Sequence, residues 1–137
     1  MRILKRMICA LIGAAAVPGL SAACEFSLGP AALHAANKNY QVALLTEPTA
    51  IAVAKPFSVK LQICRKNGFA FTGRVDVDAV MPAHRHGMNY KPALETGDDG
   101  VITGSGFVFH MPGKWQFQVR LSAGDTVQRL TLDYLLK

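Results

Sequence analysis

The alternation of apolar and polar side chains at every second position limits the possible folds of this chain more than any other feature. The alternation is clearest in residues 57–63 and 115–121. Five further segments follow it less strictly, and these are residues 40–45, 51–53, 75–79, 101–111 and 127–136. Successive side chains of a β-strand point to opposite faces, so each segment is predicted to be a half-buried strand.

Short turn signals separate these segments and favour an antiparallel arrangement. Residues 66–68, 97–100 and 123–125 combine glycine with Asn, Asp or Lys, as tight turns do. The expected fold is all-β, an immunoglobulin-like antiparallel sandwich of about seven strands. Trp115 is expected in the core between the sheets, and Gly104 and Gly106 are expected to mark a β-bulge.

The first 23 residues are predicted to be a signal peptide. Arg2, Lys5 and Arg6 precede a short apolar run, and residues 21–23 offer small side chains for cleavage. An uncleaved membrane anchor is the alternative. A lipid anchor on Cys24 is disfavoured, although not excluded, because the preceding leucine lies one residue too far from the cysteine.

The chain is thereby divided into a signal peptide (1–23), an N-terminal lead-in (24–39) and the sandwich domain (40–137). A short helical turn is expected at residues 31–36 of the lead-in. Removal of Arg2, Lys5 and Arg6 reduces the net charge from +6 to 6 − 3 = +3, and the remaining charges are scattered. This mild excess gives no reason to expect nucleic acid as a partner.

Loss of the leader leaves two cysteines, Cys24 and Cys64. An exported, periplasmic protein meets an oxidising compartment, so a disulfide between them is predicted. This disulfide would tie the N-terminus of the mature chain to the domain. A thiolate metal ligand at Cys64 is the alternative.

All methionines and three of the four histidines of the predicted mature chain lie in two short stretches, residues 81–88 and 110–113. The candidate metal ligands in them are His84, His86, Met88, His110 and Met111. In an extended segment, residues two apart project to the same side, which would bring together the first three candidates. Neighbouring strand residues point to opposite faces. His110 is therefore expected to turn outward, and Met111 is expected at the apolar end of a strand, where a ligand role stays open.

Imidazole and thioether donors together suit copper, as Cu(I) or Cu(II), better than zinc. A blue-copper centre is not expected, because that centre needs a thiolate and no cysteine lies near His110. The alternative is that the methionines are apolar fillers and that His84 and His86 are solvated loop residues. The fourth histidine, His34, is expected at the surface. No nucleophile motif or phosphate-binding loop is present in the sequence, so the protein is not expected to be an enzyme.

Two motifs taken together are similar to those of the YtkA-like family of exported bacterial domains. They are Met81-Pro82-Ala83-His84-Arg85-His86-Gly87-Met88 and His110-Met111-Pro112-Gly113-Lys114-Trp115. The resemblance extends from about residue 57 to the C-terminus and implies an immunoglobulin-like sandwich. In fold and donor type the chain is also distantly similar to periplasmic copper-resistance sandwich proteins.

The expected function is periplasmic metal binding, with copper as the expected ion, or copper delivery to a partner in the cell envelope. The alternative is an accessory sandwich that binds a cell-envelope protein without a metal. Clustering of His84, His86 and His110 would favour the first function, and wide separation of them would favour the second.

Overall fold

The computed structural model describes residues 25–137, which form nine β-strands and contain no helix. The strands are β1 (Leu33–Ala36), β2 (Tyr40–Glu47), β3 (Pro56–Arg65), β4 (Arg74–Met81), β5 (His86–Gly87), β6 (Ala93–Thr96), β7 (Ile102–Val108), β8 (Gly113–Ala123) and β9 (Thr126–Leu136). Among the described residues there is no helix long and apolar enough to cross a membrane. The predicted signal peptide and Cys24 lie outside the described residues.

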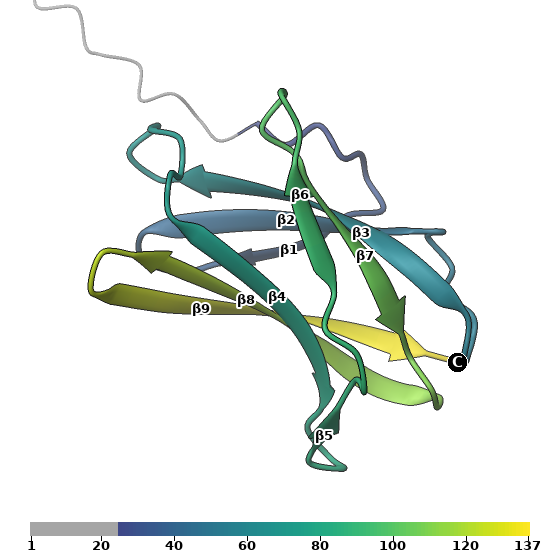
Figure 1. Ribbon diagram of the computed structural model, residues 1–137. Helices are drawn as coiled ribbons and strands as arrows, with labels where there is room; N and C mark the ends of the chain where they lie inside the picture. The colour runs from purple at the N-terminus through teal and green to yellow at the C-terminus, as the bar shows by residue number, and fades with distance from the viewer. Residues whose placement is uncertain (1–24) are drawn as a thin grey trace, which may run out of the picture.

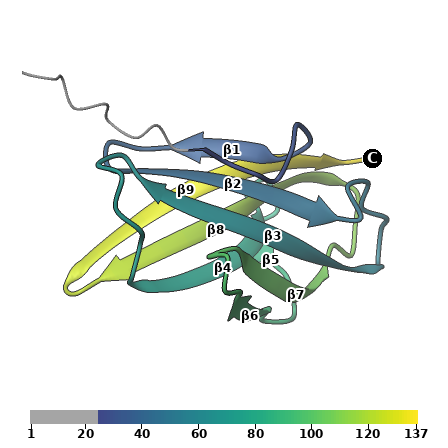
Figure 2. The same cartoon turned by 90° about the horizontal axis from the view of Figure 1, so that it is seen from above.

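Two antiparallel sheets form the layers of a sandwich (Figures 1 and 2). One sheet has the strand order β1-β2-β3-β7-β6, and the other has the order β5-β4-β8-β9. The chain changes sheet after β3, β5 and β7, so segments distant in sequence become neighbours. The predicted all-β antiparallel sandwich is confirmed.

The core consists of the side chains that the alternation placed on the apolar faces. Trp115, Phe117, Val119 and Leu121 are buried along β8, and Phe57, Val59 and Leu61 are buried along β3. Trp115, Phe107, Phe109 and Phe117 have no exposed surface. Burial of large apolar side chains on facing sheets is the main stabilising contribution in a sandwich of this size.

The predicted bulge is present in β7. Phe57 pairs with Phe107, but Val59 pairs with Gly104, so β7 contains one residue more than β3 between these pairs. Gly106 has φ 85°, a left-handed conformation that glycine adopts without steric cost. The bulge shifts the register of β7 just before the chain reaches His110.

Two local predictions were wrong. Residues 31–36 were expected to form a helical turn, but Leu33–Ala36 form β1, because pairing with β2 satisfies their backbone groups. Residues 51–53 were expected to form a strand, but they lead into a turn in which Lys55 N–H donates to Ala52 O and Ala54 has φ 57°. Ile51 is buried without being in a strand, so its apolar character indicated burial only.

Candidate functional site

The register between β4 and β8 explains why the two histidine-containing stretches meet. Val80, near the end of β4, pairs with Gln116, near the start of β8. The turn that follows β4 therefore lies at the same end of the sandwich as the residues that precede β8. β5 then folds back on β4 (Figure 1). In this pair of strands, His86 is directly opposite Met81. Directly paired residues project to the same face, so His86 lies on the face that carries the buried Met81.

Three imidazole rings lie at this end of the domain, and two of them contact the ring of His86. The centroids of the His84 and His86 rings are 5.7 Å apart, and the centroids of the His86 and His110 rings are 5.0 Å apart. His86 is thus the central ring, with one neighbour from its own turn and another from the distant β7–β8 connection. The alternative of a non-metal accessory domain would have gained support from widely separated histidines, and these rings are adjacent.

Exposure differs between the rings and the thioethers. His84 and His110 are exposed, whereas His86 is half-buried. Met88 and Met111 are half-buried and pack against the hydrophobic core. The prediction that His110 turns outward while Met111 faces the apolar interior is confirmed.

The local conformation of the first stretch differs from the expected one. His84 lies in a turn, in which its N–H donates to Met81 O at 3.1 Å, and only His86 and Gly87 form a short strand. Arg85 has φ 54°, which reverses the chain direction between the two histidines. The rings of His84 and His86 are therefore brought together by a turn and not by the alternation of an extended strand.

Trp115 contributes to the site in a way that the sequence did not indicate. Its ring lies 6.1 Å from that of His86 and 5.4 Å from that of His110, with edge-on geometry in both cases. Its indole N–H donates to Met111 O at 3.0 Å. The alternation predicted that Trp115 is a core residue, and this is correct. The only sequence signal for its contact with the histidines was that Trp115 lies shortly after His110 in the chain.

The ring separations are compatible with two imidazoles sharing one ion. A metal–nitrogen bond of about 2.0 Å places a ring centroid about 3.2 Å from the ion, so two such rings lie up to about 6.4 Å apart. Both neighbouring pairs fall within this limit. In residues 25–137, however, no group of three or more His, Cys, Asp or Glu side chains is arranged to hold a metal ion.

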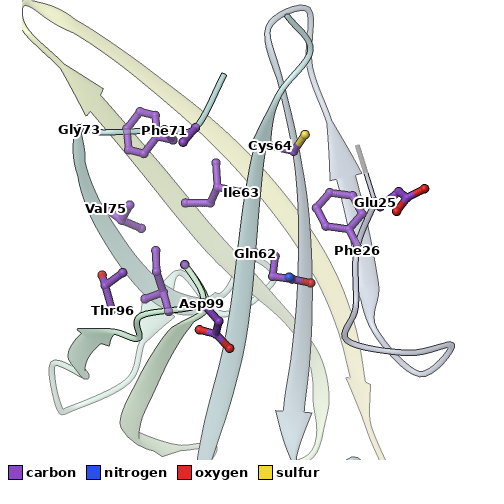
Figure 3. A pocket seen from close by; sticks show the side chains of 13 residues that line it. Glu25, Phe26, Gln62, Ile63, Cys64, Phe71, Gly73, Val75, Thr96 and Asp99 are labelled. Carbon is purple, nitrogen blue, oxygen red and sulfur yellow. The ribbon is translucent and has the colours of Figure 1, made fainter. Parts of the chain in front are cut away.

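A cavity of about 330 Å³ lies elsewhere in the domain, and none of the candidate ligands lines it (Figure 3). Its walls include Ile63 and Cys64 of β3, Phe71 from the β3–β4 connection, and Glu25 and Phe26 at the start of the described chain. Cys64 thus lines the same cavity as Glu25, the residue that follows Cys24. His34 is exposed, as predicted, and its ring contacts that of Phe26 with centroids 5.5 Å apart.

Comparison with known proteins places the chain in a family. The family model described as YtkA-like matches residues 34–120, which is more than half of the 137 residues. The matched region includes His84, His86, Met88, His110 and Met111. Searches of the curated proteins and of the solved structures find no match. The extent of the match to the family model shows that this chain belongs to the YtkA-like family.

Proposed function

We propose that this YtkA-like domain binds copper at the end of the sandwich, with His86 and His110 as the principal pair of ligands. The observation that carries the proposal is the 5.0 Å separation of these two rings, one from β5 and the other from the β7–β8 connection. His84 is exposed and lies 5.7 Å from His86, so rotation of its side chain can add a third nitrogen.

The donor set favours copper over zinc. A structural zinc site is typically built from thiolate, imidazole or carboxylate ligands and not from thioethers. Additional donors at this end of the domain are thioethers, from Met88 and Met111. Thioether sulfur selects Cu(I), and imidazole binds both oxidation states of copper.

Exposure of the site supports a role in copper delivery. His84 and His110 are exposed, so a partner protein can approach the ion without unfolding the domain. Exchangeable ligands at an open surface suit transfer to another protein of the cell envelope, which we propose as the partner class. The protein would bind and pass on the ion without catalysing a reaction, and its lack of enzymatic activity stays a prediction.

We also propose that the protein is exported to the periplasm and that Cys24 pairs with Cys64. Support for export comes from the basic residues, apolar run and small residues of the leader. Support for the disulfide comes from Glu25, which lines the same cavity as Cys64 and follows Cys24 directly (Figure 3). An oxidising compartment would keep this bond formed.

Anaerobic titration with Cu(I) against a competing chelator tests the proposed function. The test compares protein purified from the export compartment with a variant in which His84, His86 and Met88 are replaced by alanine. We expect the unmodified protein to bind Cu(I) at least about tenfold more tightly than the variant, which corresponds to about 1.4 kcal/mol. Equal affinities would remove the copper proposal.

His34→Ala is the matched control, because His34 is exposed and its ring contacts Phe26 and not the three clustered rings. This variant should bind Cu(I) as tightly as the unmodified protein. A loss of binding in His34→Ala as large as that in the triple variant would mean that histidine content, and not the described site, determines the affinity.

A further inference from the structure

We infer that Trp115 is a positioning residue that sets the relative placement of His86 and His110. The inference rests on the proposed function, because it assigns Trp115 a part in the copper affinity of the same site. Three observations carry it: the rigidity of the indole ring, its hydrogen bond to the β7–β8 connection, and its contact with both imidazoles.

The indole ring is held in one place by the core. Trp115 has no exposed surface and stacks on Phe109, with ring centroids 4.1 Å apart and an interplanar angle of 3°. It lies near the start of β8, where it is paired with Tyr134 of β9. A large ring packed in this way has no room to change its rotamer without displacing its neighbours.

The hydrogen bond fixes the connection that carries His110. The indole N–H donates to Met111 O at 3.0 Å, which links the start of β8 to the residue directly after His110. A buried indole N–H without a partner would be costly, so this bond is expected to persist. It restrains a stretch between β7 and β8 in which residues 109–112 belong to no strand.

The ring also contacts both members of the proposed ligand pair. Its centroid lies 6.1 Å from that of His86, with an interplanar angle of 71°, and 5.4 Å from that of His110, with an angle of 85°. These values fall in the range of edge-to-face aromatic contacts. One rigid side chain thus touches two imidazoles that are 110 − 86 = 24 residues apart in the sequence. We conclude that Trp115 preorganises the pair before an ion binds.

Trp115→Phe tests this role, because phenylalanine keeps a flat buried ring but has no N–H group. In the Cu(I) competition titration, we expect the affinity of this variant to fall about fivefold, as expected for loss of one hydrogen bond. In a His110→Ala background the same substitution should have no further effect, because the positioned ligand is already absent. Undiminished affinity in Trp115→Phe, or an equal loss in the His110→Ala background, would overturn the inference.

Phe117→Leu is the matched control. Phe117 is equally buried on the same strand, and its aromatic contacts are with phenylalanines and Tyr134, not with the histidines. It should disturb the core while leaving the Cu(I) affinity within about twofold of the unmodified protein. A loss as large as that of Trp115→Phe would show that general loosening of the core is responsible, and would refute positioning.

A measurement on the unmodified protein remains decisive if Trp115→Phe does not fold. Trp115 is the sole tryptophan, so its indole N–H gives one identifiable NMR resonance. Without metal, this proton should exchange slowly with solvent, and its resonance should shift on addition of Cu(I). Rapid exchange would refute the inference even if the protein binds Cu(I). If the protein does not bind Cu(I) but the indole proton exchanges slowly, the proposed function is refuted, whereas the hydrogen bond of Trp115 is supported.

Discussion

Gly113→Ala is the substitution for which the structure gives the clearest expected cost. Gly113 begins β8, directly after the connection that contains His110 and Met111. Its φ of 128° lies outside the regions that residues with a Cβ populate. An added Cβ would also lie 2.8 Å from Met81 Cε. That atom is the end of a flexible side chain, so rotation can relieve the overlap, and the backbone conformation determines most of the cost.

We expect Gly113→Ala to lower the free energy of unfolding by about 2 kcal/mol, within the range of 1–3 kcal/mol for a residue forced into such a conformation. Urea denaturation followed by tryptophan fluorescence measures this change, because Trp115 is buried only two residues away. The substitution should also weaken Cu(I) binding, since relaxation of residue 113 moves the connection that carries His110.

Gly100→Ala provides the control. Gly100 lies in the turn between β6 and β7, has φ 78°, and has nothing within 4 Å of an added Cβ. The left-handed conformation alone should cost about 1 kcal/mol, and Cu(I) affinity should not change, because this turn is at the opposite end of β7 from His110. Equal destabilisation by the two substitutions, or an unchanged Cu(I) affinity in Gly113→Ala, would refute this reasoning.

Three further predictions concern the rest of the domain. Cys64→Ser should lower the free energy of unfolding by about 4 kcal/mol if Cys24 is its partner, because the disulfide would close a loop of 64 − 24 = 40 residues. Cys24→Ser should cause the same loss. Unequal losses of the two variants in denaturation experiments would contradict the pairing. A hydrogen-bonded ion pair with Lys114 Nζ, 2.7 Å away, is the largest of the influences that lower the pKa of Asp133, which is exposed. The ion pair therefore stabilises the fold at pH values above the pKa that Asp133 has in the unfolded chain, and this stabilisation is lost as the pH falls through the pKa of Asp133 in the folded protein. The stabilisation is less than about 1 kcal/mol because the pair is exposed. Asp133→Asn should abolish this part of the pH dependence of unfolding, as measured in an acid titration. Phe109→Ala should cost about 3–5 kcal/mol in thermal or urea unfolding, because Phe109 is fully buried, and a cost below about 1 kcal/mol would contradict the packing described.

Much of the sandwich could be predicted from local pattern. β3 and β8 follow the alternation most strictly, since one face of each strand packs on the core and the other meets solvent. The bulge in β7 was also predictable, because glycine marks the position where an extra residue needs positive φ. In these segments the strand lies between the core and water, so its alternating side chains are alternately apolar and polar, and this pattern predicts the extended backbone.

The three shortest strands, β1, β5 and β6, depend on tertiary pairing and carry a weak local signal. β1 and β6 have four residues each and β5 has two, too few for an alternation to be recognised. They are strands because a neighbouring edge offers free backbone groups. Ile51 shows the opposite case, in which an apolar residue is buried by a turn.

The candidate site was predictable in composition but not in construction. Donor type singled out the five candidate ligands, but only the pairing of Val80 with Gln116 shows why their two stretches meet. The sequence did not predict the second role of Trp115, because its position fits the apolar side of the alternation. At the edge of the core, a residue that only packs and a residue that also supports a site occupy the same apolar positions of the pattern. Sequence spacing also could not show that His84 lies in a turn, since the positive φ of Arg85 is set by closure of β5 on β4.

His110 lies where the chain leaves regular strand pairing, so contacts other than strand pairing must hold its position. Residues 109–112 pass from one sheet to the other and belong to no strand, so their backbone groups need other partners. Two are supplied: Phe109 O accepts from Ala54 N–H at 2.8 Å, and Met111 O accepts from the Trp115 indole at 3.0 Å. His110 lies between these two fixed points while its own side chain remains exposed. The ligand is thus accessible to an incoming ion while its backbone is anchored to the core, so loss of the hydrogen bond from Trp115 should weaken copper binding more than loosening of the core at Phe117 does.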